Sequence, residues 1–241
     1  MATEIIEKIY QYRNLDRSVV HETVRFQPKR FLQRHMDNGR YIWNLNGVET
    51  VLYRLPEITE AIKRGEPIFL CAGEKDTDNC AKIGFEATTS PAGEGNWRDS
   101  YTETLRGAIV FIIPDNDEKG RKAALDVAER LWEACDMVKI VRLKFEGKDL
   151  TDWIDAGGTS DQLKDLCDAA PIFTPLGYLQ EYEDWLKTQN IEQLFKELEY
   201  LKTAPVKKAG CVTPLLNRFL FIRDAIEYQI PKKGGVSLAY S

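Results

Sequence analysis

The sequence lacks several features that would each indicate a particular class of protein. No apolar run approaches the roughly 20 residues that a membrane-spanning helix needs. The five cysteines contain no Cys-x-x-Cys pair, so neither a zinc ribbon nor a disulfide framework is indicated, and we expect buried, reduced thiols. There is also no G-x-x-x-x-G-K-[ST] loop, which excludes a helicase motor of that type.

An excess of positive charge is absent as well. The 241 residues carry 33 Lys and Arg against 38 Asp and Glu, a net charge of -5, which argues against indiscriminate coating of nucleic acid but permits a local basic surface.

The N-terminal stretch MATEIIEKIYQYRN has charges where a signal peptide needs an apolar core. We therefore expect a cytoplasmic protein with no membrane partner.

Alternating strand and helix patterns over residues 66–170 predict the fold class. Apolar runs such as PIFLCAG and AIVFII are each followed by a helical pattern, the longest being EKGRKAALDVAERLWEACD. Strands that alternate with helices indicate βαβ units and a parallel sheet with right-handed crossovers. We expect an α/β domain, a Rossmann-like parallel sheet flanked by helices.

Segments of different character flank this domain. Residues 1–65 read as a β-rich subdomain, with strands in EKIYQYRN, VVHETVRF and RYIWNL before a short helix that opens at Pro56. Residues 171–241 read as a helical extension, with an amphipathic helix from Tyr178 to Lys202 and a second one from Thr213. The predicted domains are thus 1–65, 66–170 and 171–241.

Two aspartates, Asp115 and Asp117, follow the buried strand Ala108 to Ile113. Ligands of an open α/β sheet bind beyond the carboxyl ends of its strands, and positions i and i+2 of an extended segment point the same way. Carboxylate oxygen suits hard cations, so one hypothesis is a Mg²⁺ or Mn²⁺ site. The alternative is an Asp-rich turn that caps the next helix.

Further acidic residues follow the neighbouring strands. GEKDTD follows PIFLCAG and supplies Glu74, Asp76 and Asp78, and GKDLTDW follows VKIVRL and supplies Asp149 and Asp152. Because all of them lie just past strand ends, we expect the fold to bring the clusters to one rim. An acidic rim that holds metal ions is suited to phosphoryl displacement.

Basic residues alternate with aromatic residues near the N-terminus. The basic residues are Arg25, Lys29, Arg30, Arg34 and Arg40, with only Asp37 against them, and they are interleaved with Phe26, Phe31, Tyr41 and Trp43. Cations for phosphates beside rings for bases are typical of single-stranded nucleic acid binding. The alternative is a solvated edge hairpin whose aromatic side chains pack inward. We expect His21 and His35 to be surface or hairpin residues.

The segment from about Glu66 to Asp155 resembles a TOPRIM domain, as found in primases, topoisomerases and some nucleases. The resemblance is carried by PDND, CAGEKD and the late GKD. The stretches VRFQPKRFLQRH, WNLNGVETVLYRLPE and GEKDTDNCAKIGFEATTSPAGEGNW are similar to the primase-type TOPRIM proteins of phages and mobile elements, over roughly residues 5 to 160. The residues that match the metal-site pattern are Asp76, Asp115, Asp117 and Asp149.

One position departs from the family. Primases of this type carry Glu-Gly after the first strand, whereas this chain has Ala72-Gly73. Either Glu74 substitutes for the missing glutamate, or the site binds metal weakly and has lost its chemistry, or the alanine is a deliberate replacement. Substitution by Glu74 requires the chain to stay extended past Gly73.

The resemblance implies a primase-like nucleotidyl transferase that makes primers in DNA replication from nucleoside triphosphates on single-stranded DNA. It implies Glu74 and Asp76 as catalytic residues and Asp115, Asp117 and Asp149 as ligands of Mg²⁺ or Mn²⁺. Lys75, Arg121 and Lys122 are candidates to neutralise phosphate charge, and Gly93 and Gly95 form a loop that either approaches a phosphate or is a plain turn. A separately encoded replicative helicase is an expected partner. The alternatives are a catalytically silent DNA- or partner-binding module and a metal-dependent nuclease.

Overall fold

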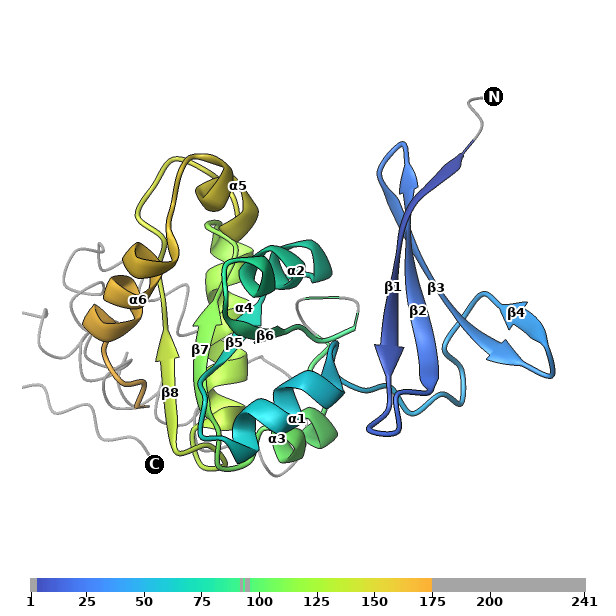
Figure 1. The fold of residues 1–241 in the computed structure, drawn as a ribbon, viewed down its shortest axis with the longest axis horizontal. Helices are drawn as coiled ribbons and strands as arrows, with labels where there is room; N and C mark the ends of the chain where they lie inside the picture. The colour runs from blue at the N-terminus through green and yellow to red at the C-terminus, as the bar shows by residue number, and fades with distance from the viewer. Residues whose placement is uncertain (1–3, 92, 94–95, 175–241) are drawn as a thin grey trace, which may run out of the picture. The chain divides into compact units, whose positions relative to one another are not determined.

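The computed structural model describes residues 4–91, 93 and 96–174 (Figure 1). Residues up to Phe173 form one compact unit. The two helices predicted from Tyr178 onward and from Thr213 lie outside the described residues. Within the described part of the chain, none of the helices is long and apolar enough to cross a membrane.

The N-terminal part forms an antiparallel sheet in the order β1-β2-β3-β4. Its strands are β1 (Ile5–Arg13), β2 (Val19–Gln27), β3 (Arg30–Asp37) and β4 (Arg40–Ile42). The turn between β3 and β4 is Asn38-Gly39, with φ of 47° and 78°. Both residues adopt positive φ, as a two-residue hairpin turn requires, and Asn-Gly is the preferred pair for it. The predicted β-rich character of this segment is confirmed.

The remaining elements alternate between helix and strand, as the sequence predicts. In chain order they are α1 (Leu55–Lys63), β5 (Ile68–Cys71), α2 (Glu74–Lys82), β6 (Glu86–Thr88), α3 (Asp99–Thr104), β7 (Ile109–Ile113), α4 (Glu118–Leu131), β8 (Met137–Ile140), α5 (Leu150–Asp155) and α6 (Ser160–Ala169). The strands β6-β5-β7-β8 form a parallel sheet in that order. The α/β fold with a parallel sheet is thus confirmed, and helices pack beside this sheet in Figure 1.

The two central strands are buried because their side chains are apolar on both faces. All four residues of β5 and four of the five residues of β7 are buried. One hydrophobic cluster joins Phe69 and Phe111 of the sheet to Trp153 of α5 and Leu163 of α6. This packing fixes the positions of α5 and α6 beside the sheet.

The strand order places a switch point between β5 and β7. The chain leaves β5 through α2 toward β6 on one side, and it leaves β7 through α4 toward β8 on the other. In open parallel sheets, ligands bind at such a switch point, beyond the carboxyl ends of the strands. Ala72 and Pro114 are the residues that follow these two strands.

Candidate functional site

A small cavity of about 50 Å³ lies at the switch point. Ala72 from the end of β5, Pro114 from the end of β7 and Gly93 from the loop after β6 all line it. Gly93 packs against Ala72, since a Cβ atom on Gly93 would lie 3.5 Å from the carbonyl oxygen of Ala72. The loop expected to approach a phosphate is therefore brought to the switch point at Gly93, while Gly95 lies outside the described residues.

Asp115 and Asp117 sit on the turn between β7 and α4. Asp117 is the N-cap of α4, and its carboxylate accepts a hydrogen bond of 2.7 Å from the backbone N–H of Gly120. The backbone N–H of Asn116 donates to the carbonyl of Lys148 at 2.7 Å, which ties the turn to the loop before α5. The capping alternative is thus confirmed for Asp117. The cap uses one carboxylate oxygen, and a carboxylate has a second one that can bind a cation.

Gly120 lets the first turn of α4 approach the aspartate turn closely. A Cβ atom on Gly120 would lie 2.5 Å from the carbonyl oxygen of Asp115 and 2.9 Å from its Cβ atom. No side chain fits there unless the turn moves. The glycine therefore sets the position of Asp115 relative to the helix.

We expect Gly120→Ala to destabilise the protein by about 1–3 kcal/mol, the usual cost of overpacking. The added methyl group must push the Asp115 turn away, so Mn²⁺ binding measured by calorimetry should also weaken. Urea unfolding measures the stability change. Gly73→Ala is the matched control, because a Cβ atom there meets nothing within 4 Å. Equal stability of the two variants would contradict the close packing of Gly120.

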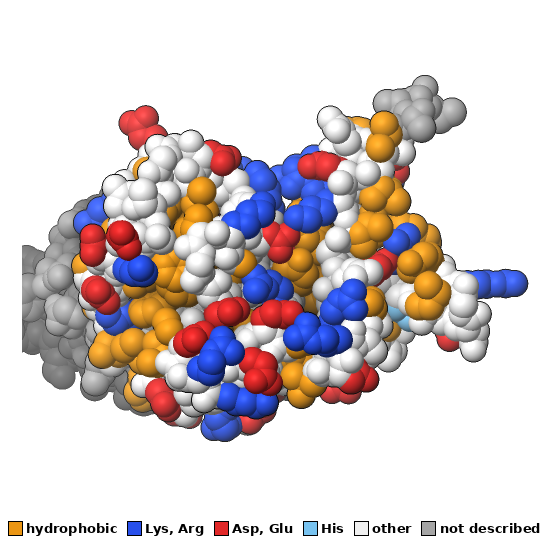
Figure 2. All heavy atoms as spheres, viewed as in Figure 1, with side chains coloured by type: hydrophobic (Ala, Val, Ile, Leu, Met, Phe, Trp, Pro, Cys, Tyr) orange, Lys and Arg blue, Asp and Glu red, His pale blue; other side chains and the backbone are white. Residues whose placement is uncertain are grey.

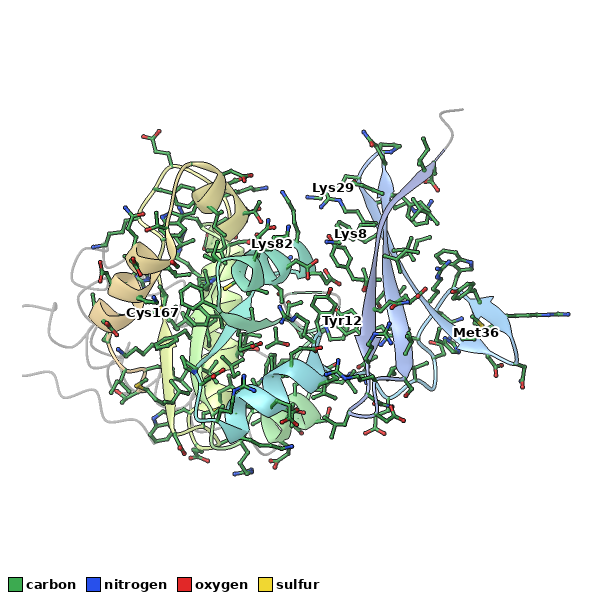
Figure 3. All side chains as sticks on the ribbon, viewed as in Figure 1. Lys8, Tyr12, Lys29, Met36, Lys82 and Cys167 are labelled. Carbon is green, nitrogen blue, oxygen red and sulfur yellow. The ribbon has the colours of Figure 1, made fainter. Side chains whose placement is uncertain are left out.

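Helix α2 points its acidic side chains in two directions. Glu74 accepts a hydrogen bond of 2.9 Å from the hydroxyl of Tyr12 in β1. Asp78, one turn later, pairs with Lys8 of β1 at 2.6 Å and accepts a hydrogen bond from Tyr53 at 3.1 Å. Figure 3 shows Lys8 and Tyr12 extending from β1 toward this helix. These two carboxylates bind the N-terminal sheet.

Asp76 points the other way, toward α5. Its side chain is only 7% exposed and accepts a hydrogen bond of 2.9 Å from the backbone N–H of Thr151 as well as one from the Thr151 hydroxyl. Burial raises the pKa of Asp76, the hydrogen bonds from Thr151 oppose this, and the carboxylate of Asp149 adds to it. Asn79 donates to the Thr151 hydroxyl at 3.0 Å, so α2 holds the start of α5 at two points.

The three acidic clusters come to the start of α5, because Asp76 bonds to Thr151 there and the turn of Asp115 and Asp117 bonds to Lys148 just before it. They do not form a complete set of metal ligands among the described residues. In the part of the chain that the structure describes, no group of three His, Cys, Asp or Glu residues is placed to hold a metal ion. Asp149 is the N-cap of α5 and accepts a hydrogen bond of 2.8 Å from the backbone of Asp152. Sequence position placed these residues past the strand ends, but helix capping and burial then turned their side chains toward different partners.

Glu74 does not meet the condition for replacing the missing glutamate. Strand β5 ends at Cys71, Gly73 is the N-cap of α2, and Glu74 is the first residue of the helix. Its carboxylate is bound to Tyr12, whereas Ala72 lines the cavity. Ala72, and not Glu74, is thus the residue of this segment that lines the cavity at the switch point.

The predicted phosphate-binding cations lie on the first turns of two helices. Lys75 is exposed on α2, and Arg121 and Lys122 are exposed on α4. Arg121 donates to the backbone carbonyl of Asn116 at 3.4 Å, within the aspartate turn. Arg121 therefore contacts the turn that carries Asp115 and Asp117.

The basic residues of the N-terminal sheet have different surroundings. Arg34 is only 7% exposed and forms an ion pair of 2.7 Å with Glu22, so it does not offer its charge to a surface ligand, contrary to expectation. Arg25 pairs with Glu7 of β1 and Arg30 with Glu4 just before β1, because the strand register brings the start of β1 to them. Lys29 and Arg40 are exposed.

His21 is buried, which corrects the expectation of a surface residue. It is 0% exposed and stacks on Tyr12, with ring centroids 4.1 Å apart. Neither ring nitrogen has a hydrogen-bond partner among the described residues. Burial above all, together with the charges of Arg98 and His35, lowers the pKa of His21 to about 4. The burial follows from the register, which places His21 opposite Tyr12 of β1.

Known structures with the same arrangement are primases. The Escherichia coli primase catalytic core superposes with a TM-score of 0.58 at 16% identity, covering 95% of this chain and 71% of the other. The fold is that of a bacterial primase catalytic core. A DnaG primase catalytic domain bound to single-stranded DNA gives 0.57 at 17% identity, over 91% of this chain and 68% of that one.

The primase fold also appears in the Aquifex aeolicus primase, with a TM-score of 0.55 at 17% identity over 92% of this chain. This chain spans only 54% of that protein, whose structure comprises zinc-binding and RNA polymerase domains. No protein-family model matches the sequence, and no curated protein matches it. Structural similarity therefore identifies the fold, and the site geometry has to support any function.

Proposed function

We propose that this chain is a primase-like TOPRIM protein that binds a divalent metal ion and single-stranded DNA and makes primers by nucleotidyl transfer in DNA replication. The observation that carries the proposal is the placement of Asp115 and Asp117 at the switch point of a primase fold. The substrates are nucleoside triphosphates and a DNA template, and a separately encoded replicative helicase is the partner we expect.

The residues present fit a Mg²⁺ ion that is bound jointly by the protein and by substrate phosphates. Mg²⁺ keeps several waters and is commonly bound by one or two carboxylates together with substrate phosphates. Asp115 and Asp117 supply two carboxylates two residues apart, and Asp149 lies close enough to Asp76 to affect its pKa. When bound, the ion would neutralise phosphate charge and orient the reacting phosphate. The chain itself contributes Arg121 and Lys122 beside the turn and Lys75 on α2 as phosphate-binding cations.

Asp76 has a positioning role in this proposal. Its carboxylate is occupied by two hydrogen bonds from Thr151 at the start of α5. These bonds fix the first turn of the helix that Asp149 caps. Asp76 therefore holds Asp149 in place.

The template-binding charge in this proposal comes from the N-terminal sheet. Its exposed Lys29 and Arg40 supply positive charge for the DNA template.

One observation favours a second candidate, a catalytically silent module that binds DNA or a replication partner. The side chain at the switch point is Ala72, and Glu74 is bound to Tyr12. A site with this composition keeps its metal-binding aspartates but lacks an acid or base at the position that faces the cavity.

The double variant Asp115→Asn, Asp117→Asn tests the proposed site. We expect it to abolish Mn²⁺ binding in calorimetry and to lower primer synthesis on single-stranded template at least a hundredfold, because neutral amides do not replace carboxylates as Mg²⁺ ligands. The matched control is Asp126→Asn, which changes an exposed carboxylate on the same helix α4.

Each alternative has its own outcome in the same assay. Shortening of the template in place of synthesis would identify a nuclease. Binding of DNA with neither product would identify the silent module. Wild-type protein that takes up no metal at millimolar concentration would exclude both metal-dependent activities.

A further inference from the structure

A row of hydrogen-bonded polar side chains crosses one face of the N-terminal sheet. Gln11 donates to Glu22 at 2.9 Å, and Arg34 donates to the other oxygen of Glu22 at 2.7 Å. Glu22 is 5% exposed and Arg34 is 7% exposed. The carboxylate thus fixes the guanidinium group of Arg34 in one place and orientation.

The guanidinium group lies against two aromatic rings. Its central carbon is 3.6 Å from the ring centroid of Tyr41 and 5.1 Å from that of Trp43. Trp43 also packs near Phe26, with ring centroids 6.2 Å apart. Even so, Tyr41 remains 45% exposed and Trp43 47% exposed. Both rings are held from beneath, and their remaining surface faces solvent.

This surface lies on the side of the sheet that faces away from helix α2. Neighbouring side chains on a strand point to opposite faces. Tyr12 binds Glu74 of α2, so its neighbour Gln11 begins a row on the other face. Met36, which pairs with Tyr41, is 53% exposed and lies on the side away from Tyr12 in Figure 3. Figure 2 shows hydrophobic side chains along this side of the N-terminal sheet.

We propose that Tyr41 and Trp43, held in place by Arg34, form a stacking platform for the bases of single-stranded nucleic acid. The inference deepens the proposed function and rests on it, since it assigns the face of the N-terminal sheet that contacts the template. Arg34 acts in it as a positioning residue that orients the rings and does not meet a phosphate.

The chemistry of the platform favours nucleic acid over a protein partner. A ring with a cation on one face keeps its other face open for a second flat, electron-rich group, which every nucleobase provides. Arg40, the residue before Tyr41, is exposed and follows the Asn38-Gly39 turn. Strand alternation turns its side chain to the opposite face from Tyr41, so its charge can meet a phosphate only of a strand that passes over the edge of the hairpin. Two half-exposed rings backed by a fixed cation match a strand whose bases stack.

The test compares two oligomers of equal length and charge, one with bases and one abasic, in fluorescence anisotropy without metal or nucleotides. We expect the double variant Tyr41→Ala, Trp43→Ala to bind the base-containing oligomer about tenfold to a hundredfold more weakly than wild type. The abasic oligomer should bind weakly to both. Trp132→Ala is the control, because Trp132 is 41% exposed but lies at the end of α4.

Three results would overturn the platform. These are unchanged affinity in the double variant, an equal loss for both oligomers, and a loss as large in Trp132→Ala. Unchanged DNA binding together with reduced self-association of the double variant in sedimentation would instead identify this face as a contact between copies of the chain.

Crosslinking keeps the proposal testable if the double variant does not fold. A 5-iodouracil oligomer irradiated with wild-type protein should form adducts on Tyr41 or Trp43, located by mass spectrometry, and adducts confined to other residues would exclude the platform. Failure of the proposed primase function gives a different result from failure of the platform: the protein would bind the base-containing oligomer more tightly than the abasic one but would make no primer.

Discussion

Ala72→Glu is expected to raise the rate of primer synthesis at least tenfold. General acid–base groups contribute typically about 10²–10⁴-fold to enzymatic rates. Position 72 follows β5 at the switch point and lines the cavity with Gly93 and Pro114. A carboxylate introduced there would have a raised pKa from its apolar surroundings, which suits proton transfer near neutral pH.

The measurement is the initial rate of primer formation on single-stranded template at saturating Mg²⁺. Ala72→Gln is the control, because it has the same size and no acid. Equal rates for the glutamate and glutamine variants would show that no acid or base acts from position 72. In that case the silent module becomes the better description of the protein. Glu74→Gln should have little effect on the chemistry, since its carboxylate is bound to Tyr12.

Stability is expected to fall steeply in mild acid because of His21. Its pKa is about 4 in the folded protein and about 6.5 when unfolded, so the unfolded chain binds the proton first as the pH falls. The contribution of neutral His21 is complete above pH 6.5 and is lost as the pH falls toward 4. A difference of about 2.5 pH units at about 1.4 kcal/mol per unit gives a loss of about 3 kcal/mol.

His21→Phe should remove this pH dependence while retaining a ring against Tyr12. Urea unfolding at several pH values between 4 and 7 measures it, and the difference between wild type and variant isolates His21. That difference matters because the raised pKa of Asp76 contributes a slope of the opposite sign in acid. His35→Phe changes the other histidine of the chain and should keep most of the slope. Parallel pH profiles for wild type and His21→Phe would contradict the assignment.

The elements were predictable because local patterns are strong in this chain. The apolar runs that became β5 and β7 had only one plausible environment, a sheet covered on both faces. The proline at the start of α1 and the long amphipathic pattern of α4 marked these helices equally well. The Asn38-Gly39 turn was an available signal for the β3–β4 hairpin, which the sequence interpretation did not use.

The site was less predictable because the side-chain directions depend on tertiary partners. Sequence reasoning located Asp76, Asp115, Asp117 and Asp149 past the strand ends. It did not identify Thr151 or Tyr12, whose hydrogen bonds decide where Asp76 and Glu74 point. Both are separated from their partners by more than 60 residues, so no local pattern connects them.

The same holds for the basic residues of the N-terminal sheet. The acidic partners of Arg25 and Arg34 lie on the adjacent strand, and that of Arg30 lies just before β1. The pairing therefore depends on a register that the imperfect alternation of β2 left open. The sequence pattern predicted that Arg34 is an exposed cation among aromatic residues. In the structure, Glu22 lies directly opposite Arg34 in the register. Only the register shows that Arg34 belongs under the rings of Tyr41 and Trp43.

Helix α2 has a mechanical consequence for the whole unit. Glu74 and Asp78 attach it to the N-terminal sheet, while Asp76 and Asn79 attach it to α5. A hydrogen-bonded helix of nine residues moves as a rigid rod. A displacement of the N-terminal sheet relative to α5 would have to move this rod or break its bonds, so α2 couples the position of the sheet to the position of Asp149.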